Sequence, residues 1–245
     1  MNKMLRGISL AIVAVGSAAI VSSCGTTTST ANLTVKGAGS ASTSARLAAV
    51  DLQASNPAAL KLKIYKVAFS TSALCTNLQT VYTKTESEAT YSDFLLNPSI
   101  VQNGSLADGT YKCVVIEFSS IIKPTTTATD GSCTAATEFS LDVCGSQGGN
   151  TTTSTLIDGT TTTCTAGDDH IAMYLSTGST QTNGTEGHNA FQAPTSESDA
   201  LHGFKLTNPF VKAGAVTGTF VVNGAGKING DGASCEMQPP LFSFQ

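Results

Sequence analysis

Hydrophobic and polar residues alternate along much of the chain with the two-residue period of β-strands. The apolar positions Leu60, Leu62 and Ile64 are separated by lysines, so one face of this segment is apolar and the other is polar. The apolar positions change phase before residue 67. This change predicts a β-bulge near Tyr65 and Lys66, or a twist that buries both faces of the strand.

The most hydrophobic stretch after the N-terminal leader lies between Tyr111 and Ile122, where apolar residues are nearly continuous from Val114 to Phe118. A short run of this kind predicts a central strand that is covered on both faces. An Asp-Gly turn at residues 108–109 precedes it. We expect this strand to form the centre of the core, packed with Ile64, Val67, Ile171, Leu175, Phe220 and Val222.

Further short strands are predicted at residues 78–83, 171–175, 203–206, 217–222 and 227–229, and residues 91–96 fit a single helical turn. Short strands separated by turn residues predict an all-β fold, and specifically one antiparallel β-sandwich over residues 32–245. Residues 124–169 are rich in Thr, Gly and Ser. We interpret this segment as a long polar loop insertion, held by cysteines and otherwise exposed.

The N-terminus has the organisation of a signal peptide. Lys3 and Arg6 precede an apolar run from Ile8 to Val21, which at 14 residues is too short to span a bilayer. The run ends in the sequence Val-Ser-Ser-Cys-Gly, in which the cysteine is Cys24. Residues 1–23 are therefore predicted to be a signal peptide.

This junction resembles the lipobox of bacterial lipoproteins, in which an aliphatic residue and two small residues precede a cysteine. The resemblance implies that Cys24 carries a diacylglycerol group, that the leader is cleaved before it, and that residues 24–31 tether the fold to the membrane. Gly25 follows the cysteine where an aspartate would favour the inner membrane, which implies the outer membrane. The alternative is an ordinary secretory signal, with Cys24 left as a free thiol or a disulfide partner.

The chain has seven cysteines, and removal of Cys24 leaves an even number. In an exported protein six cysteines indicate up to three disulfides, and 15 pairings are open to them. Our preferred pairs are Cys144 with Cys164, Cys75 with Cys113, and Cys133 with Cys235. The alternative is that one or two pairs stay reduced as buried side chains.

The mature sequence has a second resemblance. Residues Leu106-Ala107-Asp108-Gly109-Thr110-Tyr111 precede the long apolar strand, and a strand at residues 218–222 comes late in the chain. This arrangement resembles uncharacterised bacterial lipoproteins with a transthyretin-like, or prealbumin-like, β-sandwich. The resemblance implies that fold, and it supplies no catalytic residues.

The charge of the chain and its sequence motifs argue against several classes of function. Charged residues make up 12% of the chain, against about 25% in typical proteins. The net charge is -4, and it becomes -6 once the two leader cations are removed, so a partner nucleic acid is not expected. Neither a hydrolase Gly-x-Ser-x-Gly motif nor a phosphate-binding loop occurs, and no cofactor is predicted.

Two groups of residues are candidate binding sites. Asp158, Asp168 and Asp169 are weak candidates for calcium ligands, because carboxylates are the oxygens that this ion prefers. Exposed aromatic residues would give a platform for a sugar or a protein, and the candidates are Tyr82, Tyr91, Tyr174 and Phe191.

The sequence favours a lipid-anchored protein of the cell envelope that is not an enzyme and acts as a binding or structural module. Its partners would be the membrane, through the lipid, and an unidentified protein or carbohydrate ligand. Two alternatives remain open. One is a surface glycosidase or esterase with catalytic residues in loops, for which His170, His188 and His202 are the available bases. The other is a calcium-dependent adhesin.

Overall fold

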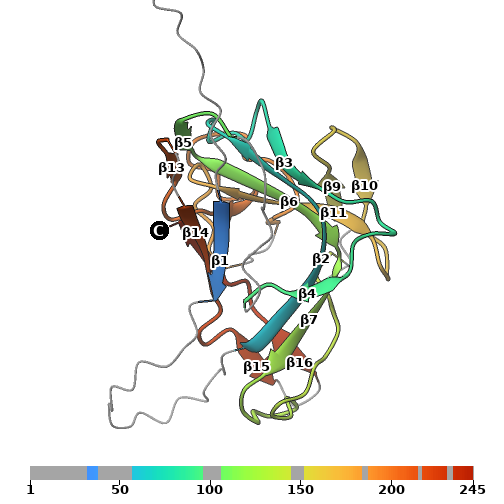
Figure 1. Ribbon diagram of the computed structural model, residues 1–245. Coiled ribbons are helices and arrows are strands. Elements are labelled where there is room, and N and C mark those ends of the chain that lie inside the picture. Colours follow the sequence, from blue (N-terminus) through green and yellow to red (C-terminus); the bar gives the residue numbers. More distant parts are fainter. Residues whose placement is uncertain are drawn as a thin grey trace, which may run out of the picture.

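The computed structural model describes residues 57–95, 106–144, 152–183, 187–214, 220–230 and 234–244, and the backbone of residues 32–37 and 217–219 (Figure 1). The predicted leader, Cys24 and the predicted tether lie outside these residues. The described residues form strands, turns and loops without a helix, which confirms the all-β class. Accordingly, this part of the chain contains no helix that is long and apolar enough to cross a membrane.

One strongly curled sheet makes up most of the body. Its strands follow the order β12-β11-β6-β2-β7-β8, and β3 and β4 also pair with β2. The strands are β2 (Pro57–Ser70), β3 (Gln79–Thr83), β4 (Tyr91–Asp93), β6 (Cys113–Ser119), β7 (Ile121–Thr126), β8 (Leu141–Asp142), β11 (His170–Ser176) and β12 (Phe204–Lys205).

The long strand β2 organises this sheet, and Figure 1 shows it as an arc. Its first half pairs with β7 and β4, and its second half pairs with β6 and β3. Only Ser120 separates β6 from β7, and the pairing register continues from one to the other with small shifts. Bending at these shifts curls the sheet into half of a barrel.

The predicted bulge is present in β2. Ile64 pairs with Phe118 and Lys66 pairs with Glu117, so Tyr65 is the extra residue. Because of this residue, the strand can keep Ile64 and the later apolar positions in the core and still place Lys66 beside Glu117. The change of phase in the apolar pattern therefore reflects the predicted β-bulge at Tyr65.

A small sheet packs against the hollow side of the curled sheet. It consists of β14 (Thr217–Asn223) between β1 (Asn32–Gly37) and β17 (Leu241–Phe244). Phe220 and Phe244 from this sheet lie with ring centroids 6.1 Å from those of Phe94 and Phe69, respectively. Three short pairs complete the described body: β5 (Gly109–Tyr111) with β13 (Phe210–Lys212), β15 (Ile228–Gly230) with β16 (Cys235–Met237), and β9 (Thr153–Thr155) with β10 (Thr161–Thr163).

The expectation of an antiparallel sandwich was correct only at the level of the all-β class. β1 runs parallel to β14, and β11 runs parallel to β12, so the sheets are mixed. The larger sheet is curled into a half-barrel instead of lying flat against a partner of equal size. Turn residues and alternation identify strands, but they do not specify which strands pair or in which direction.

The core lies where the sequence placed it. The six residues expected to pack against the central strand belong to one buried cluster with Val114, Ile116 and Phe118 of that strand; in this cluster Phe118 is 3% exposed and Ile171 is fully buried. Val115 faces the other side of the strand and belongs to a second cluster. Aromatic rings from the curled sheet, the small sheet and the β5–β13 pair meet in the first cluster, among them Phe69, Tyr111, Phe210, Phe220 and Phe244. Packing of this kind is the main source of stability for a fold without helices.

Residues 91–96 were wrongly predicted to form a helical turn. Tyr91–Asp93 form β4, which pairs with residues 61–63 of β2. The amide of Phe94 donates to the carbonyl of Leu60 at 2.7 Å, and Asp93 accepts from the amide of Leu95 at 2.9 Å. The edge of β2 thus provides the hydrogen bonds that a single isolated turn would lack.

The segment at 124–169 is less of a free loop than its composition indicates. Residues 124–126 continue β7, and β8 adds to the same sheet. A hairpin of β9 (Thr153–Thr155) and β10 (Thr161–Thr163) lies over the outer face of β11 and β6. Leu156 of this hairpin packs in a second buried cluster with Val115 and Tyr174. Every residue of β6 is consequently buried, as expected for a strand covered on both faces.

The structure contains three disulfides, and they join the pairs that the sequence favoured. Cys75 is bonded to Cys113, Cys133 to Cys235, and Cys144 to Cys164. The second bond connects the loop after β7 with β16, where Gly131, with φ of +54°, lies directly against Gly230. A Cβ atom at Gly131 would come within 2.4 Å of the carbonyl oxygen of Gly230. A side chain at this position would therefore separate the two linked loops.

Candidate functional site

The three aspartates that are weak candidates for calcium ligands are each bound by donors of the fold. Asp158 accepts from the Thr160 amide at 2.9 Å, and Asp169 accepts from the Thr165 amide at 2.6 Å. Asp168 accepts a hydrogen bond from the hydroxyl of Ser119. Across the described parts of the chain, no group of three or more His, Cys, Asp or Glu residues is arranged to hold a metal ion.

The aromatic platform is not formed as expected. Tyr174 is 3% exposed and Phe191 is 8% exposed, so both belong to the interior. The hydroxyl of Tyr174 donates to the carbonyl of Thr155 at 2.7 Å, and burial raises the pKa of Tyr174 to about 12. Tyr82 and Tyr91 are half-buried and lie beneath the amines of Lys84 and Lys123.

The densest cluster of ionisable groups surrounds Glu117, a residue that sequence reasoning missed. Glu117 lies in the middle of β6, between Lys66 of β2 and Ala172 of β11, and its side chain is fully buried. It faces the outer side of the sheet, where the β9–β10 hairpin covers it: the amide of Ile157 donates to its Oε1 at 2.6 Å. The sequence signal was present as a single charged residue inside an almost continuous apolar run.

Two further donors bind the other carboxylate oxygen of Glu117. The Lys66 amine lies 3.1 Å from Oε2, and His170 Nε2 lies at the same distance. Burial by itself would raise the pKa of Glu117, but the hydrogen bonds from His170, from the Ile157 amide and from Lys66 outweigh it and hold the pKa below its ordinary value. Glu117 is therefore a buried carboxylate with its charge matched by neighbours on three elements.

His170 connects this cluster to the surface. Its Nδ1 lies 3.3 Å from Oε1 of the exposed Glu86, while Nε2 faces Glu117. The ring of Tyr65, the bulge residue, lies with its centroid 4.3 Å from that of His170. Both ring nitrogens of His170 thus have partners within the fold.

A second cluster organises residues 195–203. Asp199 is 6% exposed and accepts from the amides of Thr195, Leu201 and His202 at 2.7, 2.7 and 3.1 Å. The Thr195 hydroxyl and His202 Nδ1 also bind its Oδ2, at 2.8 and 2.9 Å. Burial would raise the pKa of Asp199, but these hydrogen bonds hold it well below the usual range. This carboxylate holds a loop together.

His188 lies near the same loop and has a different environment. Its Nε2 is 2.8 Å from the carbonyl oxygen of Gly203, and its ring centroid is 4.9 Å from that of Phe204. Burial lowers the pKa of His188 and outweighs the hydrogen bond to Gly203. Each of the three histidines therefore has at least one ring nitrogen bonded to a group of the fold.

The charge of Asp199 should make the stability of the protein depend on pH. Its pKa is lower in the folded state than in the unfolded state, so its stabilising contribution is complete above about pH 4 and is lost as the pH falls through the folded value. We expect Asp199→Asn to lower the free energy of unfolding at pH 7 by about 2 kcal/mol, as for hydrogen bonds to a charged group. The difference from the wild type should shrink below pH 4, measured by urea denaturation at each pH.

Asp158→Asn is the matched control, because Asp158 is an exposed turn residue with the same type of amide contact. This variant should unfold almost as the wild type does at pH 7. An Asp199→Asn variant with the same urea midpoint as the control would show that the buried carboxylate does not stabilise the loop.

Comparison with protein-family models, with curated proteins and with solved structures finds no match for this chain.

Proposed function

We propose that the protein is a lipid-anchored component of the cell envelope, held by Cys24, whose β body is a non-catalytic binding or structural module. One observation carries the non-catalytic part. Glu117 and Asp199, the buried carboxylates that contact histidines, have their oxygens bound by donors of the fold. Catalytic acids and bases need a free position within reach of a substrate.

The anchoring part is supported by the leader and by the cysteines. Three disulfides among the six remaining cysteines are typical of proteins that fold in an oxidising compartment, and they leave Cys24 without an assigned pair. A thiol in this position, after a signal sequence, is what lipid attachment requires. Two acyl chains would make the anchoring effectively permanent.

The ligand class proposed for the body is a protein or a carbohydrate of the envelope, with no nucleic acid as partner. The net charge of -4 supports this choice, because a phosphate backbone is bound by clustered cations.

Cys24→Ser tests the anchor. Bacteria that express the wild type and are fed a labelled fatty acid should incorporate the label into this protein, and the variant should lose all of it, because the sulfur atom is the site of lipid transfer. The variant should also keep its leader. Label retained on the variant would refute the assignment of Cys24.

Alanine variants of His170, His188 and His202 test the absence of catalysis. Purified wild type and variants are assayed on ester and glycoside substrates. We expect no turnover above the buffer rate for any of them. An activity in the wild type that one histidine variant abolishes would establish the hydrolase alternative and overturn the proposal.

A further inference from the structure

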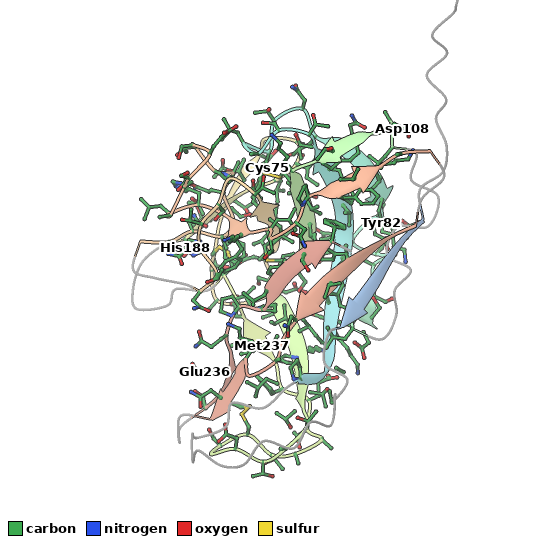
Figure 2. The ribbon with its side chains drawn as sticks, turned by 90° about the vertical axis from the view of Figure 1, so that its left-hand side faces the viewer. Cys75, Tyr82, Asp108, His188, Glu236 and Met237 are labelled. Carbon is green, nitrogen blue, oxygen red and sulfur yellow. A yellow bond between two sulfur atoms is a disulfide. The ribbon has the colours of Figure 1, made fainter. Side chains whose placement is uncertain are left out.

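The start of β1 determines at which end of the body the tether enters. Asn32, the first residue of β1, pairs with Thr217 at the start of β14. Two residues shortly before β14 bind Asp108, which directly precedes β5. Lys212 Nζ lies 2.8 Å from Asp108 Oδ1, and the Gly214 amide donates to the same oxygen at 3.0 Å. Figure 1 shows the start of the β1 arrow on the side of the body where β5 and β13 lie, and Figure 2 places Asp108 on that side. We call residues 108–112 and 211–214 the near end.

The opposite end is formed by β15, β16 and the loops that Cys133 and Cys235 join. β14 ends at Asn223, and the next residue, Gly224, lies against Pro57 at the start of β2. Figure 2 places Glu236 and Met237 at this end, remote from Asp108. We call residues 129–134 and 228–237, as far as the structure describes them, the far end.

The length of β2 sets an upper limit on the separation of the two ends. It starts at Pro57 beside Gly224 and finishes at Ser70, whose carbonyl accepts from the Lys112 amide at 2.9 Å. At about 3.3 Å per residue its length is roughly 43 Å along the curve. Cys24 and Asn32 are eight positions apart in the sequence. Eight residues span at most about 28 Å in any conformation.

We propose that the near end faces the lipid surface and that the far end is turned away from it, toward the partner. This inference rests on the proposed lipid anchor at Cys24. Turning the body over would move Asn32 away from the membrane by at least the distance from Thr217 to Gly224, about 23 Å for seven strand residues, with β15 and β16 lying beyond that point (Figure 1). A flexible chain of eight residues has a root-mean-square length of only about 16 Å. The reversed orientation would therefore need an almost fully extended tether. The short tether thus selects the end of the molecule that meets lipid.

The exposed side chains of the near end suit a lipid surface. Val211 is 61% exposed, more than the other large hydrophobic residues in the described part of the chain. Thr110, which pairs with Val211, and Lys112 are also exposed, and the ammonium group of Lys112 would favour anionic headgroups. The negative charge of Asp108 is matched by Lys212. At the far end, anionic headgroups would repel the carboxylate of the exposed Glu236.

The test uses the full-length lipidated protein in vesicles of phosphatidylethanolamine and phosphatidylglycerol that contain a headgroup-labelled energy acceptor. A fluorescent amino acid replaces either Val211 or Glu236, so that no thiol is added. Both positions are exposed, and unchanged thermal midpoints would verify the fold. We expect strong energy transfer from position 211 and a loss of most of it at position 236.

The control lengthens the tether by sixteen Gly and Ser residues after Gly25, which raises its maximal reach to about 80 Å. The difference between the two positions should then disappear. Equal or reversed transfer with the native tether, in protein that floats with the vesicles, would overturn the orientation and leave the anchor intact. Protein that fails to float would overturn the anchor, and the orientation with it.

Discussion

Replacing both Cys133 and Cys235 with alanine should lower the free energy of unfolding by about 4.7 kcal/mol, as the chain-entropy relation gives for a loop of this length. The bond closes a loop with a sequence separation of 102 residues, the longest of the three disulfides. Its loss would free the unfolded chain and release β16 from the loop after β7. Guanidinium denaturation under non-reducing conditions measures the change.

The matched control removes Cys144 and Cys164 in the same way. That bond has a sequence separation of 20 residues, so its loss should cost about 3 kcal/mol. Mass spectrometry must show that the remaining disulfides are formed in each variant. A larger loss of stability in the control than in the Cys133 and Cys235 variant would contradict the loop-length argument.

Glu117→Ala should lower the free energy of unfolding by about 3 to 5 kcal/mol, the range for removing one partner of a buried ion pair. The change leaves Lys66 and His170 without their common carboxylate and the Ile157 amide without its acceptor. The β9–β10 hairpin should then be held less firmly to the sheet. Urea denaturation gives the loss of stability, and hydrogen exchange of the Ile157 amide gives the local effect.

Glu138→Ala is the control for this variant. Glu138 also forms a close ion pair, 2.6 Å from Lys61, but both side chains are substantially exposed, at 37% and 42%. Such surface pairs contribute about 0 to 1 kcal/mol. An equal decrease in the free energy of unfolding for the two variants would mean that the buried ion pair of Glu117 stabilises the fold no more than an exposed one does.

The sequence predicted the elements of the core well because burial leaves a local signal. The continuous apolar run at 114–118 identified a strand covered on both faces, and the change of phase before residue 67 identified the bulge at Tyr65. Both features depend on which side each residue faces, and alternation records this directly. The disulfide pairs also agreed with the choice made from the sequence.

Strand order and direction were harder to predict, because they depend on contacts between segments remote in sequence. The parallel pairing of β1 with β14 joins residues 32–37 to residues 217–222, and local composition does not encode it. The helical turn expected at 91–96 failed for the same reason, since the edge of β2 decides its conformation. Tertiary context overrides local propensity in such short segments.

The clusters of buried ionisable groups were not predicted from the sequence. The three aspartates named as weak calcium candidates lie in turns and loops, whereas the clusters around Glu117 and Asp199 were not anticipated. Glu117 gathers donors from β2, from β11 and from a hairpin some 40 residues later in the chain. A single charged residue within an apolar strand was the only sequence signal for this cluster, and such a residue needs buried partners.

Intact mass spectrometry of the protein extracted from membranes tests whether Cys24 carries the lipid anchor. We expect the mass of residues 24–245 with six hydrogens fewer, for three disulfides, and with a diacylglyceryl group on Cys24, with or without a further acyl chain on its amine. A mature chain that begins at another residue, or one that carries Cys24 without lipid, would contradict it.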